Sequence, residues 1–221
     1  MSKTRNSFFD RLLDVLYPPD VACTLCGREA LLGQDRLCDV CRASLSPSPA
    51  LVCPSQLDGI VAGYIYAGAV RTGIRALKYQ GQVRLAPFFA DALSLPSNWM
   101  IDCVVPVPLH PLKRWLRSYN QSELIAQDLC QRTGLPLKPN LLRRTRFTKS
   151  QTTLNGFERA KNVSQAFAAS PAVRGLSILL IDDVTTTHST LLACAAALRA
   201  AGATRVYAAS ATAASHGADR E

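Results

Sequence analysis

Two groups of residues in this chain have the types and spacing that chemistry requires. The first begins with adjacent carboxylates, Asp182 and Asp183, and continues into a run of hydroxyl and imidazole side chains. The run consists of Thr185, Thr186, Thr187, His188, Ser189 and Thr190. A hydroxyl-rich loop that leads into a helix N-terminus offers N–H and O–H donors to an anion, so we predict a phosphate cradle. The carboxylates beside it could accept hydrogen bonds from two sugar hydroxyls or hold a phosphate-bound Mg²⁺.

The second group is a set of four cysteines in two Cys-x2-Cys pairs. Cys23 and Cys26 form one pair, Cys38 and Cys41 form the other, and eleven residues separate them. Four thiolates can close a tetrahedral Zn²⁺ site with Zn–S bonds of about 2.3 Å, and a closed site leaves no position for water. We therefore predict a structural Zn²⁺ site, the alternative being ordinary buried cysteines. Cys53 has no partner at the matching spacing, so we expect no second metal site.

The size and composition of the chain limit what else it can be. It has 221 residues, 48% of them hydrophobic, which suits one folded domain with a small appended module. No apolar run approaches the roughly eighteen residues of a membrane span, and the first twenty residues lack the pattern of a secretory signal. We expect a cytoplasmic protein without membrane insertion, in which clustered cysteines are metal ligands rather than disulfides.

Elements that would position the first group can be recognised around it. Ile178–Ile181 is a short, wholly apolar run, typical of a strand buried on both faces, and an Ala/Leu-rich helix is expected from there to Gly202. Ile101–Val105 predicts a second buried strand, which Val-Pro-Val-Pro bends at its end. Alternating apolar residues over 60–66 predict a half-exposed strand. We expect an α/β fold with a parallel sheet flanked by helices.

The domain division follows from composition. Apolar residues spaced over 8–16 predict a short N-terminal helix, and Ser-Pro-Ser-Pro over 46–49 is typical of a linker. We expect residues 1–50 to form the N-terminal helix and cysteine module, 51–212 the main domain, and 213–221 a flexible tail.

Positive charge is concentrated in one part of the chain. Residues 113–161 contain eleven basic and three acidic residues, a local net charge of +8 out of a total of +9. Such a concentration suits a polyanionic partner, either a pyrophosphate-bearing molecule or nucleic acid, and a solvated basic face is the alternative. Lys78, at the end of a predicted helix over 70–79, could reach a phosphate, but its position is more typical of a solvated surface lysine.

The segment Ile-Asp-Asp-Val-Thr-Thr-Thr-His-Ser-Thr resembles the binding signature of type I phosphoribosyltransferases. That family usually has Gly where this chain has His188, because the backbone there approaches a phosphate closely and favours positive φ. His is enriched among non-Gly residues at positive φ, and an imidazolium attracts an anion. Val-Pro-Val-Pro-Leu-His, Arg-Ser-Tyr-Asn-Gln over 117–121 and the cysteine pairs are similar to the ComF (competence protein F) branch, over about 12–212.

The resemblance implies a type I phosphoribosyltransferase-like fold with an N-terminal zinc ribbon, and roles for particular residues. Asp182 and Asp183 would hold the ribose hydroxyls of phosphoribosyl pyrophosphate, and the following hydroxyl loop would hold its 5-phosphate. Arg117, Lys113 and a loop cation such as Lys149 would face the pyrophosphate, together with Mg²⁺. Nothing in the sequence marks a general base or a nucleobase pocket, so the acceptor of a transfer reaction stays open.

A second hypothesis is a non-catalytic accessory protein on the same scaffold. The ComF branch is linked to DNA uptake, and a zinc ribbon with a basic face would suit an adapter for single-stranded DNA or for a DNA-uptake protein. Aromatic side chains for base stacking are sparse in the basic stretch. A homodimer is among the assemblies that the sequence leaves open.

Overall fold

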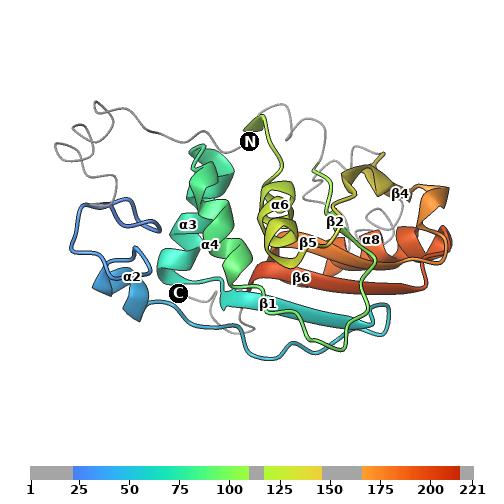
Figure 1. Cartoon of the computed structure of the whole chain (residues 1–221), viewed down its shortest axis with the longest axis horizontal. Helices are drawn as coiled ribbons and strands as arrows, with labels where there is room; N and C mark the ends of the chain where they lie inside the picture. The colour runs from blue at the N-terminus through green and yellow to red at the C-terminus, as the bar shows by residue number, and fades with distance from the viewer. Residues whose placement is uncertain (1–21, 110–116, 146–165, 215–221) are drawn as a thin grey trace, which may run out of the picture.

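The computed structural model describes residues 22–109, 117–145 and 166–214, and the statements below concern those residues (Figure 1). The predicted helix over 8–16, the residues Lys113 and Lys149, part of the basic stretch over 113–161 and the end of the tail lie outside the described residues.

The main sheet has four parallel strands in the order β1-β6-β5-β2. Their bounds are Gly59–Ile65 for β1, Cys103–Pro106 for β2, Ser177–Thr185 for β5 and Arg205–Ala213 for β6. Because β5 has a strand on each side and helices over both faces, its run Ile178–Ile181 is fully buried, as the apolar sequence predicts. A separate antiparallel pair consists of β3 (Leu142–Arg144) and β4 (Phe167–Ala169).

Helices cover both faces of the sheet, which confirms the predicted fold class. Helices α3 (Gly68–Tyr79), α4 (Ala86–Asp91) and α6 (Gln121–Thr133) lie together on one face (Figure 1). Leu179 and Ile181 of β5 join their core, whereas Ile178 and Leu180 point the other way, into the core that contains α8 (Ser189–Ala200). The two cores therefore meet at β5, which alternates its side chains between them. Short 3-10 turns occupy Val83–Leu85, Pro139–Leu141 and Pro171–Val173.

The cysteine module packs directly onto the main body. It contains α2 (Asp39–Ala43), and its Leu25 and Leu37 belong to the same buried core as α3 and α6. The expected linker also contacts the sheet, since Ser48 N–H donates to Gly63 O at 2.9 Å and Ile65 N–H donates to Ser46 O at 2.8 Å. The module and the sheet thus share a core, and the division at residue 50 stays a prediction.

Two elements are longer than the sequence indicates. Strand β5 continues past the carboxylates to Thr185, and β6 continues to Ala213 instead of ending near residue 210. Both extensions pair with each other, with Thr185 opposite Ala213, and β6 also pairs with β1 over Thr212 and Ala213. Backbone pairing on both sides of β6 extends the strand into sequence that is merely alanine-rich.

No helix in the described ranges is both long enough and apolar enough to pass through a bilayer.

Candidate functional site

The paired carboxylates lie near the carboxyl end of β5, between two helices of one face. Asp182 Oδ1 accepts hydrogen bonds from Ser122 Oγ at 3.1 Å and from the backbone N–H of Asp183 at 2.9 Å. Asp183 Oδ1 lies 2.8 Å from Nζ of Lys78, the penultimate residue of α3. The carboxylates therefore have different partners, a hydroxyl from the start of α6 and an ammonium from the end of α3.

Asp182 is the more unusual of the two electrostatically. Burial and the neighbouring charge of Asp183 raise its pKa from 3.8 to about 7, although hydrogen bonds and the charge of Lys78 oppose the shift. A carboxyl with such a pKa changes charge near neutral pH. Its ionised form is the stronger acceptor for a hydroxyl and the form that binds a cation.

The residues of the predicted phosphate cradle surround a small cavity. Asp182 and residues 184–191 line a small cavity of about 50 Å³, open to solvent, at the N-terminus of α8. Thr187 and Ser189 form a hydroxyl pair at 2.7 Å on its exposed rim. Thr185 Oγ1 is buried and has no hydrogen-bond partner among the described residues. This group of donors at a helix N-terminus suits an anion.

His188 adopts the backbone conformation that its place in the motif requires. It is the N-cap of α8 with φ 61° and ψ 0°, in the left-handed region that glycine adopts most easily. Its backbone carbonyl accepts from Leu192 N–H at 2.9 Å, so the helix begins normally. The prediction that His stands in for Gly at positive φ is confirmed.

The start of α6 lies next to the carboxylates and is held in place by hydrogen bonds. Asn120 caps the helix: its side-chain oxygen accepts from Ser122 N–H at 3.2 Å, and its Nδ2 donates to Val107 O at 3.0 Å. Gln121 is fully buried and accepts from Arg117 at 3.0 Å. The three-residue start of α6 therefore joins β2, β5 and Arg117.

Arg117, one of the predicted cations, lies beside the end of α3. Its guanidinium carbon is 4.6 Å from the ring centroid of Tyr79, which stacks the cation on the aromatic face. Tyr119 Oη donates to Leu77 O at 2.5 Å and ties the same two segments together. The other two predicted cations, Lys113 and Lys149, lie outside the described residues.

The prediction that Lys78 is a solvated surface lysine was wrong. Its side chain is only 18% exposed and ion-paired, so it is not a solvated surface lysine. The signal that could have found it was its position, one residue before the end of an amphipathic helix whose buried residues include Ile74 and Leu77. A lysine next to such a face can reach across the sheet edge. Ser122 is a second residue whose contact with the carboxylates the sequence did not indicate.

A second, larger cavity lies beside the end of β2. It has a volume of about 350 Å³ and lies between the end of β2, the start of α6 and β3. Proline rings of Pro106 and Pro108 form part of its wall, and Asn120 and Glu123 form another. Asn120 thus separates this cavity from the hydroxyl of Ser122 beneath Asp182.

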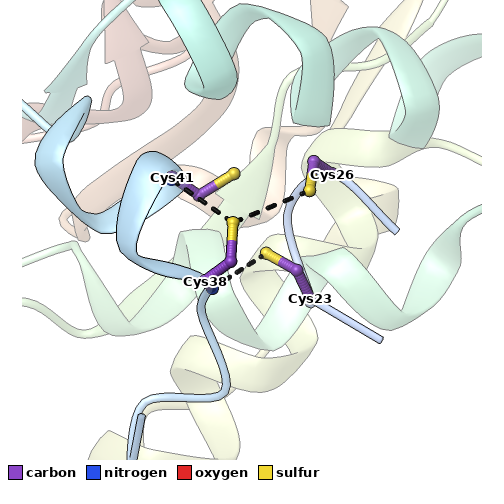
Figure 2. A group of neighbouring side chains, drawn as sticks. All are labelled: Cys23, Cys26, Cys38 and Cys41. Carbon is purple, nitrogen blue, oxygen red and sulfur yellow. Dashed lines mark hydrogen bonds between the residues drawn. The ribbon is translucent and has the colours of Figure 1, made fainter. Parts of the chain in front are cut away.

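The four predicted metal ligands lie together, as Figure 2 shows. Their sulfur atoms are within 4.8 Å of one another, and backbone N–H of Cys38 donates to Cys23 Sγ at 3.4 Å. A tetrahedron with Zn–S bonds of about 2.3 Å has S···S edges of about 3.8 Å, so little contraction would be needed. The four thiols are therefore close enough to hold a metal ion. All eight cysteines of the chain are free thiols, and Cys53 lies apart from the cluster.

The electrostatics of the cluster also suit a cation. Burial would raise the pKa of the Cys23 thiol, but hydrogen bonds from the backbone of Cys26, Cys38 and Leu25 lower it to about 6. Burial and neighbouring thiols raise the pKa of Cys41. Arg42 of α2 forms a two-point ion pair with Asp35, at 2.7 and 2.8 Å, which links this helix to the loop before it.

Comparison with known proteins gives relatives for most of the chain. The DNA utilization protein YhgH of Salmonella typhi is 29% identical over 214 residues, covering 83% of this chain and 93% of that protein. Competence protein F of Haemophilus influenzae is 32% identical over 149 residues, covering 62% of this chain and 65% of that protein. The chain is a homologue of these two proteins. The predicted resemblance to ComF-like proteins is confirmed, although no protein-family model matches the chain.

Solved structures similar to the chain include two with phosphoribosyl names. Glutamine phosphoribosylpyrophosphate amidotransferase from B. subtilis has 20% identity and a TM-score of 0.39, covering 63% of this chain and 27% of that one. A hypoxanthine phosphoribosyltransferase from Staphylococcus aureus has 13% identity and a TM-score of 0.31, covering 62% and 61%. The chain thus spans about a quarter of the amidotransferase.

Proposed function

We propose that the chain binds phosphoribosyl pyrophosphate, with Mg²⁺, at the carboxyl end of β5, and transfers the phosphoribosyl group to an acceptor. The observation that carries this proposal is the juxtaposition of two carboxylates with an anion-sized, donor-lined cavity at the N-terminus of α8. A phosphorylated sugar presents neighbouring hydroxyls and one phosphate, which are the groups that these two parts of the site complement.

The predicted site residues have the following roles in this proposal. Asp182 and Asp183 accept from the ribose hydroxyls, and Thr185, Thr186, Thr187, His188, Ser189 and Thr190 surround the 5-phosphate with hydroxyl and backbone donors. Arg117 faces the pyrophosphate, and we assign the same task to Lys113 and Lys149. When bound with the pyrophosphate, Mg²⁺ supplies positive charge that stabilises the leaving group. Catalysis then consists mainly of positioning and charge stabilisation.

For the cysteine cluster we propose a structural Zn²⁺. The four sulfur atoms supply a complete tetrahedral set, so no position is left for a reacting water. The ion would fix a segment that is too short to form a core alone and that borrows the core of α3 instead.

A second candidate function is single-stranded DNA binding linked to competence or DNA utilization, and one surface favours it. The relatives carry those names, and α3 presents Arg71 and Arg75 on its exposed face, four residues apart. Tyr79 follows at the same spacing, is 69% exposed and lies under Arg117. Cations beside an open aromatic face suit phosphates and a stacked base.

The first proposal is tested by isothermal titration of phosphoribosyl pyrophosphate with MgCl₂ into the full chain. We expect binding by the wild type, at least tenfold weaker binding by Asp182→Asn/Asp183→Asn, since two charge-assisted hydrogen bonds are lost, and unchanged binding by the exposed control Asp91→Asn. Equal affinities for all three proteins would refute the assignment of the binding site to Asp182 and Asp183. A screen for pyrophosphate release against nucleobases and amines then tests transfer.

The second candidate is tested by fluorescence anisotropy with a labelled single-stranded oligonucleotide. Affinity should fall steeply with salt, with a log–log slope of about −0.7 for each phosphate contacted, and Arg71→Ala/Arg75→Ala should flatten that slope. A salt-independent signal would exclude this function.

A further inference from the structure

The ion pair between Lys78 and Asp183 places a built-in cation on one of the two site carboxylates. Nζ of Lys78 lies 2.8 Å from Asp183 Oδ1, and the two side chains are only 18% and 10% exposed. A sugar hydroxyl or a metal ion that uses this oxygen atom must share it with Lys78 or replace the ammonium. In the free protein, therefore, Lys78 neutralises the charge of Asp183, one of the two site carboxylates.

The place of Lys78 in the fold makes an exchange of partners feasible. Its backbone is held, because Tyr119 Oη donates to the carbonyl of the preceding Leu77. Its side chain is a flexible four-carbon stem with a compact charge, which can change partners without moving the helix. Arg117 lies over Tyr79, the next residue along α3, so two cations gather at this helix end. The phosphate cavity lies elsewhere, against α8.

We propose that Lys78 is a ligand-binding residue that the free protein stores on Asp183 and that turns to the pyrophosphate group when the ligand binds. This inference rests on the proposed function and adds a residue to its site. The exchange leaves no buried charge alone: Asp183 accepts from the ribose hydroxyl, and Lys78 pairs with the pyrophosphate beside Arg117. Lys78 therefore contributes to binding of the pyrophosphate group and not to binding of the ribose 5-phosphate part of the ligand.

The test compares Lys78→Met and Lys78→Gln with the wild type and with Arg84→Met. Arg84 is exposed on the 3-10 turn Val83–Leu85 that follows α3, so its substitution also removes a positive charge but leaves the partner of Asp183 in place. Lys78→Gln keeps a hydrogen-bond donor for Asp183 and serves as the second variant if Lys78→Met folds poorly. Titrations use phosphoribosyl pyrophosphate, pyrophosphate and ribose 5-phosphate, each with MgCl₂, and Mn²⁺ alone as a probe of the free carboxylates.

We expect both Lys78 variants to bind phosphoribosyl pyrophosphate and pyrophosphate about tenfold or more weakly, as the loss of a charge-assisted contact implies. Ribose 5-phosphate should bind within about threefold of wild type, and Mn²⁺ alone should bind the variants more tightly because Asp183 is released. Arg84→Met should match the wild type throughout.

Four results would overturn the inference. Equal weakening of pyrophosphate and ribose 5-phosphate would mean a structural effect, and equal effects of Arg84→Met and Lys78→Met would mean general electrostatics. Unchanged affinity in both Lys78 variants, with a wild type that binds, would refute the role of Lys78 alone. A wild type that binds none of the three phosphorylated ligands would refute the proposed function as well.

Discussion

Ligand affinity should depend on pH through Asp182. Burial and the charge of Asp183 raise the pKa of this carboxyl to about 7, and Lys78 of α3 and Ser122 of α6 are the other groups that act on it. If the ligand binds only the ionised form, the competent fraction rises from about one-tenth at pH 6 to about nine-tenths at pH 8. Apparent affinity then rises about tenfold over that interval.

Ser122→Ala separates this effect from ionisation of the ligand. A phosphate group also titrates near pH 6, but it does so identically for every variant. Removing the Ser122 hydroxyl takes away a hydrogen bond to the charged form of Asp182, so its pKa rises further, by about one unit. We expect the affinity profile of Ser122→Ala, measured by titration calorimetry from pH 5.5 to 9, to shift to higher pH by that amount. Superimposed profiles for the two proteins would refute this role of Asp182.

The same shift has a consequence for stability, and its sign is opposite to that of a salt-bridged carboxylate. The pKa of Asp182 in the folded chain, about 7, exceeds the ordinary value of 3.8. Its contribution to folding is therefore most favourable below pH 4, is lost as pH rises towards 7, and is constant above that. Asp182→Asn should flatten this part of the curve of unfolding free energy against pH, as measured by denaturant titration.

Three further outcomes are expected elsewhere. His188→Gly should keep or raise the unfolding free energy, by up to about 1 kcal/mol in denaturant melts, because φ 61° suits glycine, whereas His188→Val should lower it. Chelation of the metal, or Cys38→Ser, should lower the melting temperature of the whole chain, together with loss of about one Zn²⁺ per chain by metal analysis, since Cys38 lies in the core shared with α3. Leu25→Ala should cost about 2–5 kcal/mol in denaturant titration, because Leu25 is 2% exposed and packs against Phe89 and α3; a loss below about 1 kcal/mol would mean that the module is not integral to the core.

Local sequence signals were sufficient to predict most of the framework. The run Ile178–Ile181 predicts its strand because a buried parallel strand has no polar face, and Ile101–Val105 predicts β2 in the same way. The positive φ of His188 was expected from the resemblance to a motif that usually has Gly at this position, and His is among the non-Gly residues that tolerate it. The spacing of the cysteines predicted a cluster because metal ligation needs four donors around one point.

Contacts between distant segments were beyond such signals. Lys78 pairs with Asp183, and Ser122 with Asp182, only because α3 and α6 both lie on the same face of the sheet (Figure 1). Strand β6 extends to Ala213 because its neighbours β1 and β5 supply backbone partners, which its own sequence does not predict. Helical and strand periodicity describe what a segment buries but not which segment it meets.

The shared core gives α3 a place in both halves of the molecule. Its buried face, with Val70 and Ile74, packs in the same cluster as Leu25 and Cys41 of the cysteine module, while its last turn carries Lys78 to Asp183. A rigid helix transmits a displacement of one end to the other, so loss of the metal should disturb the ion pair as well as the module. The cysteine cluster would then act on ligand binding through the position of Lys78, without contacting the ligand. Chelated protein should accordingly lose affinity for pyrophosphate more than for ribose 5-phosphate, whereas an equal loss for both would indicate general unfolding.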